Sequence, residues 1–243
     1  MSRVDDYLIA ALKALPSKPD DRAKQSEKKA YSEAMSAGVA LALATELRAR
    51  GMTEARPARP GEPGLSGAER RLAGGIGAKK VDVTWATEES GLLLGISVKT
   101  INFCDGRTGN YQKNLTNRRG DMLAEALTLH RRFPYAVVAG FLFLDMGARF
   151  DQTAKRKSTF DNAFPRLRLF TGRHDPAGRD EQYERLYLVL VDAGQARPVF
   201  ECYHVCEPET AVLLSDVMDD LVGLVAERNF DFYEAADGRV ARV

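Results

Sequence analysis

Apolar and polar residues alternate most regularly over residues 79–100, KKVDVTWATEESGLLLGISVKT, and this alternation predicts a β-hairpin. The apolar residues at every second position are Val81, Val83, Trp85, Leu94, Ile96 and Val98. Successive side chains of a strand point to opposite faces, so each strand has one apolar and one polar face. Residues 88–91, Glu-Glu-Ser-Gly, are typical of the turn between the two strands.

The position of this turn predicts which polar residues meet. If it is centred between Glu89 and Ser90, the numbers of opposite residues sum to about 179. Asp82 then faces Ser97, and Lys99 lies two residues farther along the same face.

The remaining segments predict an α/β protein. Helical spacing of apolar residues predicts helices at 4–15, 26–50, 116–132 and 153–170, the last interrupted near Pro165, and a C-terminal helix after Pro208. Apolar runs of strand length occur at 135–145, 186–192 and 198–205. This order of elements indicates a central mixed β-sheet with helices on both faces.

The chain divides into an N-terminal helical segment (1–52), a Pro/Gly-rich loop (53–66) and a core (67–243), which forms a single domain together with the N-terminal helix. A short helix is expected at 66–72, with Glu69 at its third position. No apolar run reaches the roughly 18 residues that span a bilayer. The segment 1–16 lacks the features of a signal peptide, and three cysteines, an odd number, argue against a disulfide framework. We therefore expect a cytoplasmic protein that is not embedded in a membrane.

The net charge of +1 hides a strong segregation of charge. Residues 99–119 have five basic and one acidic side chain, and residues 149–179 have eight basic and three acidic ones. Residues 200–243 have three basic and ten acidic side chains. This distribution permits a basic groove for a phosphate backbone, backed by an acidic surface, and solvated helix faces explain it equally well.

An acid and a lysine on the polar face of one hairpin suit phosphodiester hydrolysis. A carboxylate can hold Mg²⁺, which lowers the pKa of bound water and neutralises phosphate charge. A nearby lysine can position or deprotonate the water, or stabilise the developing charge. Asp82 and Lys99 are the residues that the pattern offers for these tasks.

This hairpin resembles the PD-(D/E)xK nuclease superfamily, which has the restriction-endonuclease-like fold. Asp82 matches the first acid of the motif, and Ser97-Val98-Lys99 matches its second half, with Ser97 where the family usually has Asp or Glu. Some members recruit the missing carboxylate from a helix. Glu33 and Glu69 are the candidates for that role, with Glu33 slightly favoured.

The resemblance implies a Mg²⁺-dependent DNA endonuclease, most like a type II restriction enzyme. Asp82, Glu33 and Glu69 would be the metal ligands, and Lys99 would position or activate the water. A palindromic target in double-stranded DNA implies a homodimer, because two-fold DNA is matched by two-fold protein.

The loop after Lys99 contains the side chains that we expect to contact DNA. Its amide and basic groups suit base edges and phosphates, and the start of the following helix favours a phosphate. The candidates are Asn102, Arg107, Asn110, Gln112, Lys113, Asn114, Arg118 and Arg119. Alternatively, the loop is a polar surface connection whose amides cap turns. The run 155–157, Lys-Arg-Lys, either touches the DNA backbone or forms a solvated helix face.

Other functions fit the same sequence. The chain can be a DNA-binding or assembly module with a degenerate nuclease site, a view that Ser97 supports. It can also be the nuclease effector subunit of another bacterial defence or repair complex, or an unrelated α/β protein. Cys202, His204 and Cys206 alternate on one expected strand, but buried thiols explain this pattern better than zinc does.

Overall fold

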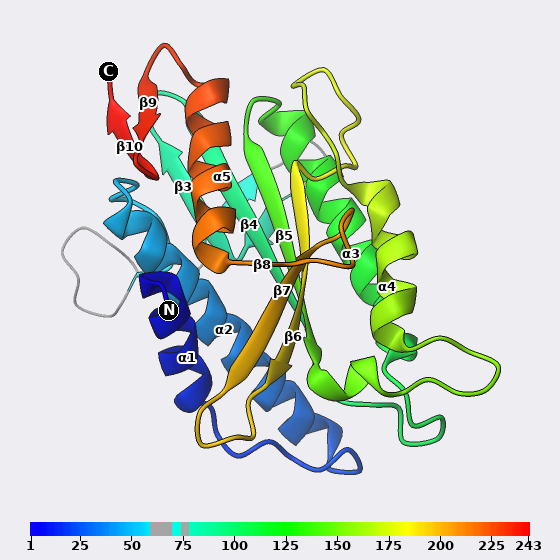
Figure 1. Ribbon diagram of the computed structural model, residues 1–243. Helices are drawn as coiled ribbons and strands as arrows, with labels where there is room; N and C mark the ends of the chain where they lie inside the picture. Colours follow the sequence, from blue (N-terminus) through cyan, green and yellow to red (C-terminus); the bar gives the residue numbers. More distant parts are fainter. Residues whose placement is uncertain (59–69, 74–77) are drawn as a thin grey trace.

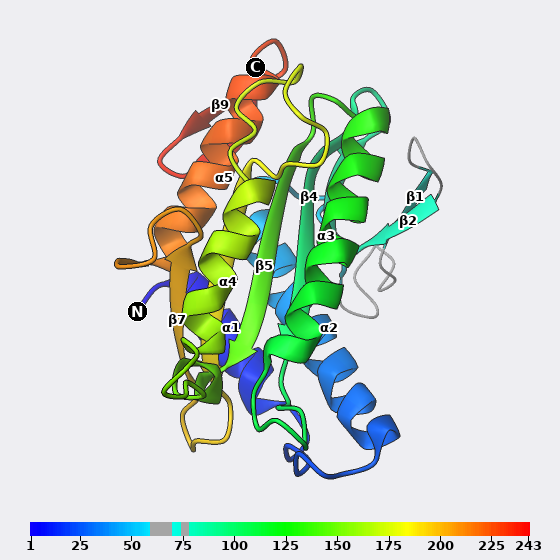
Figure 2. The ribbon, with the colours of Figure 1, turned by 90° about the vertical axis from the view of Figure 1, so that its right-hand side faces the viewer.

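The computed structural model describes residues 1–58, 70–73 and 78–243. It confirms an α/β architecture with a six-stranded mixed sheet between two layers of helices (Figures 1 and 2). The helices are α1 (Arg3–Lys13), α2 (Gln25–Ala49), α3 (Gln112–Arg132), α4 (Thr159–Leu167) and α5 (Leu214–Arg228), with 3₁₀ turns η1 (Met146–Arg149) and η2 (Arg168–Phe170). The main sheet contains β3 (Val83–Thr87), β4 (Gly91–Ile101), β5 (Val137–Asp145), β6 (Arg185–Asp192), β7 (Val199–His204) and β8 (Ala211–Val212), in that order. Two separate hairpins pair β1 (Arg70–Ala73) with β2 (Ala78–Val81) and β9 (Tyr233–Ala236) with β10 (Arg239–Arg242).

Strands β4, β5 and β6 run parallel to one another, whereas β3, β7 and β8 pair antiparallel to their neighbours. The carboxyl ends of the three parallel strands therefore lie at the same edge of the sheet. In α/β sheets this edge is where ligands usually bind, because the loops that follow the strands gather there.

The sheet has a core on each face, because alternate residues of its strands point to opposite helix layers. On β5, Val137, Ala139 and Phe141 pack with α1, α2 and α5, whereas Val138 and Leu142 pack with α3 and α4. Figure 2 shows α3 and α4 on the near face of the sheet, with α1 and α2 behind it. Helix α2 thus belongs to the same packed unit as the strands.

The expected hairpin register is confirmed for three pairs, Val83–Ile96, Thr84–Gly95 and Trp85–Leu94. A β-bulge at Trp85/Ala86 then shifts the pairing by one residue toward the turn.

Several expected boundaries were wrong. Helix α3 begins at Gln112 instead of residue 116, and the Asn110 side chain accepts a hydrogen bond from the Gln112 N–H at its first residue. Helix α4 begins only at Thr159, where the Ser158 hydroxyl accepts from Asp161 N–H. Residues 70–72 form strand β1, not a helix, and the rest of that expected helix lies outside the described residues. Strands β8, β9 and β10 were not expected.

Candidate active site

Four polar side chains from the hairpin and from α3 meet near the carboxyl half of β4. The Lys99 Nζ atom lies 3.3 Å from Asp82 Oδ2 and 2.9 Å from Glu125 Oε2. The Val98 backbone N–H donates to Asp82 Oδ2 at 2.7 Å, and the Ser97 hydroxyl donates to Glu125 Oε2 at 3.0 Å. The structure therefore brings together the three hairpin residues expected from the sequence and adds Glu125, which was not anticipated.

Glu125 reaches this cluster from α3, which packs against the sheet beside Gly140. Ser97 on β4 is paired with Gly140 on β5. A Cβ atom on Gly140 would lie only 2.7 Å from Met122 Cε and 2.6 Å from Leu186 Cδ1. The missing side chain thus makes room for the Met122 turn of α3, and Glu125 lies one turn later, above Ser97.

The position of Glu125 in the sequence is unusual for an acid, although Glu125 lies outside the hairpin motif. Leu115, Met122, Ala126 and Leu129 form the buried stripe of α3. Glu125 falls within this stripe, three residues after Met122 and four before Leu129. An acid on the apolar face of a helix must find a polar partner when the helix packs, so its position alone marks it as unusual.

Burial controls the electrostatics of the cluster. The exposed fractions of the Asp82, Lys99 and Glu125 side chains are 18%, 16% and 5%. Burial raises the pKa of Glu125, and the neighbouring Asp82 charge raises it further, against an opposing effect of Lys99. For Lys99, burial acts to lower the pKa, but Glu125 and Asp82 outweigh it and the net shift is upward. Lys99 therefore keeps its proton at neutral pH.

The cluster contains two carboxylates, the ligand type that a divalent cation such as magnesium prefers. Glu125 Oε1 is buried and has no hydrogen-bond partner among the described residues, although its second oxygen has two. The described residues contain no group of three or more His, Cys, Asp or Glu side chains placed to hold a metal ion. Magnesium, however, is commonly bound by one or two carboxylates, with water and substrate phosphates completing its shell. Asp82 and Glu125 provide two.

The two helix glutamates expected to complete the site have different outcomes. Glu33 lines a groove that opens beside the cluster, but its side chain is 68% exposed. Its carboxylate lies 3.7 Å from Lys29 Nζ, one helical turn away. Its role as a metal ligand stays a prediction. Glu69 lies outside the described residues. Among the described contacts, the helix glutamate that joins Lys99 is Glu125.

A groove of about 840 Å³ opens beside the cluster, between the first half of α2 and the loop that leads from β4 to α3. Its lining includes Asp82 and Lys99. The charged side chains that line it are Lys28, Lys29, Lys80, Lys99, Lys113, Arg118, Glu33, Asp82 and Asp105, a net charge of +3. The surplus of positive charge in a confined groove favours an anionic ligand.

Of the residues expected to contact DNA, some are buried within the protein and others line the groove. Asn102 and Asn110 are buried; Asn102 donates to the Ser32 hydroxyl, and the Asn110 side chain accepts from the Gln112 N–H at the start of α3. Their assignment as DNA contacts stays a prediction. Lys113, Asn114 and Arg118 line the groove, where Lys113 lies 2.8 Å from Asp105 Oδ2 and Arg118 lies 3.2 Å from Asp121 Oδ2.

The other three candidates lie elsewhere on this loop and helix. Arg107 is exposed at the tip of the loop, and Gln112 is half-buried in the first turn of α3. Arg119 lies over the Phe170 ring at 5.6 Å, on the side of α3 that faces η2. Arg119 is thus directed toward its own protein.

Of the alternating cysteines and histidine, Cys202 belongs to the core, whereas His204 and Cys206 are half-buried. Cys202 is buried, and burial raises the pKa of its thiol to about 12. A thiol that keeps its proton is a poor zinc ligand.

Comparison with protein-family models, curated proteins and solved structures finds no match for this chain. Within the described residues, none of the helices combines the length and the apolar character needed to cross a bilayer. The site must therefore be interpreted from its own chemistry.

Proposed function

We propose that this protein is a Mg²⁺-dependent endonuclease that hydrolyses phosphodiester bonds in double-stranded DNA, with the active site at Asp82, Lys99 and Glu125. One observation carries the proposal: a lysine ammonium lies within 3.3 Å of two carboxylates, and the more buried carboxylate keeps one oxygen without a partner. A desolvated carboxylate with an unused oxygen is costly unless a cation or proton satisfies it. This supports a working site over a structural ion pair, and it agrees with the resemblance of the hairpin to PD-(D/E)xK nucleases.

Asp82 and Glu125 would hold the cation, which when bound would supply an acidified water and a positive clamp on phosphate oxygens. Ser97 occupies the place of the second acid of the motif, and its hydroxyl orients Glu125 by donating to Oε2. Lys99 acts through its charge, because its raised pKa keeps it protonated. It can donate to the attacking water or to the phosphate oxygen on which negative charge develops.

The groove supports a nucleic acid as the substrate. Lysine and arginine side chains from α2, the hairpin and the start of α3 surround the cluster. A phosphate backbone bound there would bring a scissile phosphate next to Asp82 and Lys99, which both line the groove. Cytoplasmic location and a homodimer acting on a palindromic target remain expectations that follow from this activity.

The first test is cleavage of mixed plasmid and phage DNA with Mg²⁺, with EDTA and with Lys99→Ala. We expect discrete fragments that require Mg²⁺ and a loss of rate of at least about 100-fold in Lys99→Ala. Lys13→Ala is the matched control, since Lys13 is an exposed lysine in the last turn of α1. This variant should cut at the wild-type rate.

Thermal unfolding of each variant separates a lost activity from a lost fold. If folded wild-type protein cuts no duplex, the second candidate function gains support, a DNA-binding or assembly module with a degenerate site or a subunit that needs a partner. If Lys99→Ala cuts as fast as wild type, the active site is assigned to the wrong residues.

A further inference from the structure

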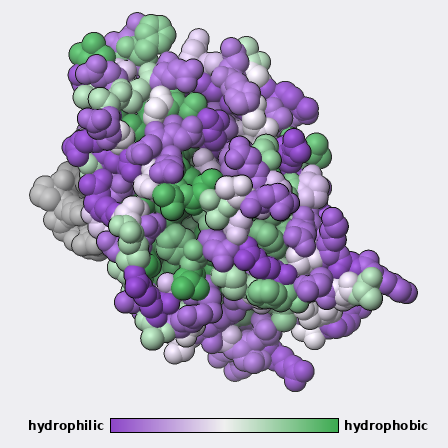
Figure 3. Space-filling view, viewed as in Figure 1, coloured by the Kyte–Doolittle hydropathy of each residue, from purple (hydrophilic) through white to green (hydrophobic). Residues whose placement is uncertain are grey.

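Two loops project side by side at the carboxyl edge of the sheet. The first joins β4 to α3 and has its exposed tip at residues 106–109, and the second, residues 150–158, follows η1 and precedes α4. Both extend toward the lower right in Figure 1, and Figure 2 shows them next to each other at the lower end of the molecule. The corresponding part of the surface in Figure 3 is mostly hydrophilic.

Asp151 links the two loops. Its Oδ2 atom accepts a hydrogen bond from Tyr111 N–H at 3.0 Å, just before α3, and its Oδ1 atom accepts from Thr159 N–H at 2.6 Å, at the start of α4. The Asp151 carbonyl also accepts from the Arg156 guanidinium. One aspartate thus fixes the second loop to the element that forms a wall of the candidate active-site groove.

Within the run Lys155-Arg156-Lys157, the three basic residues have different surroundings. Arg156 is half-buried and bound to Asp151. Lys155 and Lys157 are exposed, and neither has an ion-pair partner among the residues that the structure describes. Helix α4 begins only at Thr159, so these lysines stand on a braced loop instead of the helix face considered from the sequence.

We propose that this loop is a second contact for duplex DNA, in which Lys155 and Lys157 bind phosphates outside the cleavage groove. The inference rests on the proposed function, because it takes the groove as the place of the scissile phosphate. Two exposed ammonium groups on a braced loop suit a phosphate backbone, since binding then has to order the two lysine side chains but not the loop that carries them. The connection through Asp151 makes the loop continuous with the groove wall, so one DNA molecule can contact both.

The test measures the dissociation constant of labelled duplexes in EDTA, which prevents Mg²⁺-dependent cleavage, as a function of salt. One duplex is just long enough to fill the groove, and the other extends well beyond it. For Lys155→Ala/Lys157→Ala we expect weaker binding of the long duplex alone. For this long duplex, the slope of log affinity against log salt concentration should become shallower by about 1.8 in the double variant. Each phosphate contact to B-DNA contributes about 0.9 to this slope, and two contacts are removed.

Arg239→Ala/Arg242→Ala is the matched control, because it removes two positive charges from the β9–β10 hairpin, at the opposite end of the molecule (Figure 1). It should leave both slopes unchanged. An equal effect of the two double variants would show that only net charge matters and would overturn the inference, as would unchanged binding of the long duplex by Lys155→Ala/Lys157→Ala. If that variant binds like wild type while wild type still cuts with Mg²⁺, the second contact fails and the proposed function stands.

Discussion

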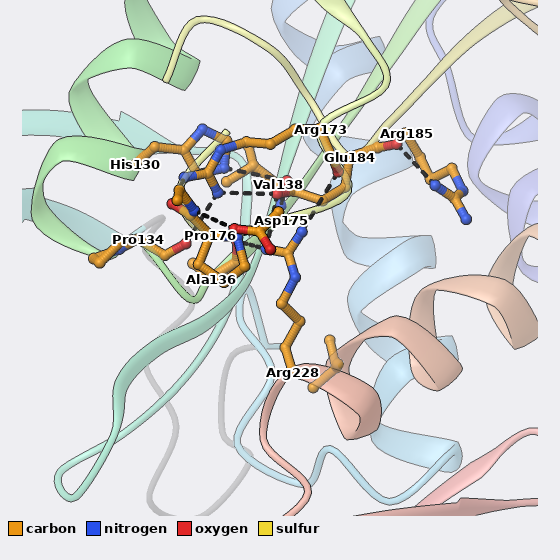
Figure 4. Close-up of polar contacts among 12 residues, drawn as sticks. His130, Pro134, Ala136, Val138, Arg173, Asp175, Pro176, Glu184, Arg185 and Arg228 are labelled. Carbon is orange, nitrogen blue, oxygen red and sulfur yellow. Dashed lines mark hydrogen bonds and ion pairs between the residues drawn. The ribbon is translucent and has the colours of Figure 1, made fainter. Parts of the chain in front are cut away.

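Two buried glutamates, Glu125 on α3 and Glu184 just before β6, show what separates a structural ion cluster from a candidate active site. Glu184 lies just before β6, and each of its oxygens has two partners. Oε1 accepts from Arg173 at 3.2 Å and Arg228 at 2.9 Å, and Oε2 accepts from Val138 N–H at 2.7 Å and lies 3.1 Å from His130 Nε2 (Figure 4). Glu125 has two partners on one oxygen and none described on the other.

The two environments shift the carboxyl pKa in opposite directions. Burial alone would raise the pKa of Glu184, but His130, the Val138 N–H and Arg228 more than offset it, and the net shift is downward. Burial raises the pKa of Glu125, and its single lysine does not compensate. A saturated carboxylate is held in place as an ion, whereas an unsaturated one retains capacity for a ligand.

The largest effect should come from removing the charge of Glu125. For Glu125→Gln we expect cleavage to fall by about 10³-fold, equivalent to about 4 kcal/mol, because one of two cation ligands is lost. Steady-state cleavage with Mg²⁺ measures this change. Glu33→Gln provides the comparison, since Glu33 is an exposed glutamate at the rim of the same groove. If Glu33→Gln loses more activity than Glu125→Gln, Glu33 is the helix glutamate that completes the site.

The next effect concerns stability. Glu184→Ala leaves Arg173, Arg228 and His130 buried without their shared carboxylate, so we expect the free energy of unfolding to fall by about 3 kcal/mol or more. Denaturant unfolding measures this loss. Cleavage below the unfolding midpoint should be unchanged, since the side-chain partners of Glu184 are His130, Val138, Arg173 and Arg228 and not Asp82, Lys99 or Glu125. If folded Glu184→Ala loses cleavage, the Glu184 cluster also serves activity, and the distinction between it and the Glu125 cluster is wrong.

The sequence predicted the local part of this arrangement. Alternation and turn residues gave the register of the hairpin, and this register was enough to bring Asp82 toward Lys99. The central strand β5 was expected because its apolar run has the length of a buried strand.

The sequence did not predict the contacts that depend on packing between distant elements. Glu125 joins the site from α3, which packs over the sheet beside Gly140, and neither residue belongs to the hairpin motif. Likewise, Asp151 sets the start of α4 through a contact with Thr159 that no periodicity reveals. The Glu184 cluster combines residues from α3, α5 and two loops, so no local pattern marks it.

The smallest effect, and the most direct measure of the difference, is the pH dependence of stability. The folded-state pKa of Glu184 is lowered, so its stabilising contribution is present above the usual glutamate pKa of about 4.3 and is lost as the pH falls through the folded value. The folded-state pKa of Glu125 is raised, so its contribution is present below about pH 4.3 and is lost as the pH rises through the folded value. Lys99 stays protonated throughout this range.

The measurement is the free energy of unfolding of wild type, Glu125→Gln and Glu184→Gln in EDTA between about pH 3 and pH 8. The stability difference between wild type and Glu184→Gln should decrease toward acid, and that between wild type and Glu125→Gln should decrease toward neutral pH. If the two stability differences change with pH in the same direction, the assignment of opposite environments to Glu125 and Glu184 is wrong. Adding Mg²⁺ makes the comparison sharper, because a cation bound to Glu125 lowers the pKa of that carboxyl and flattens its slope, while the Glu184 slope stays as it was.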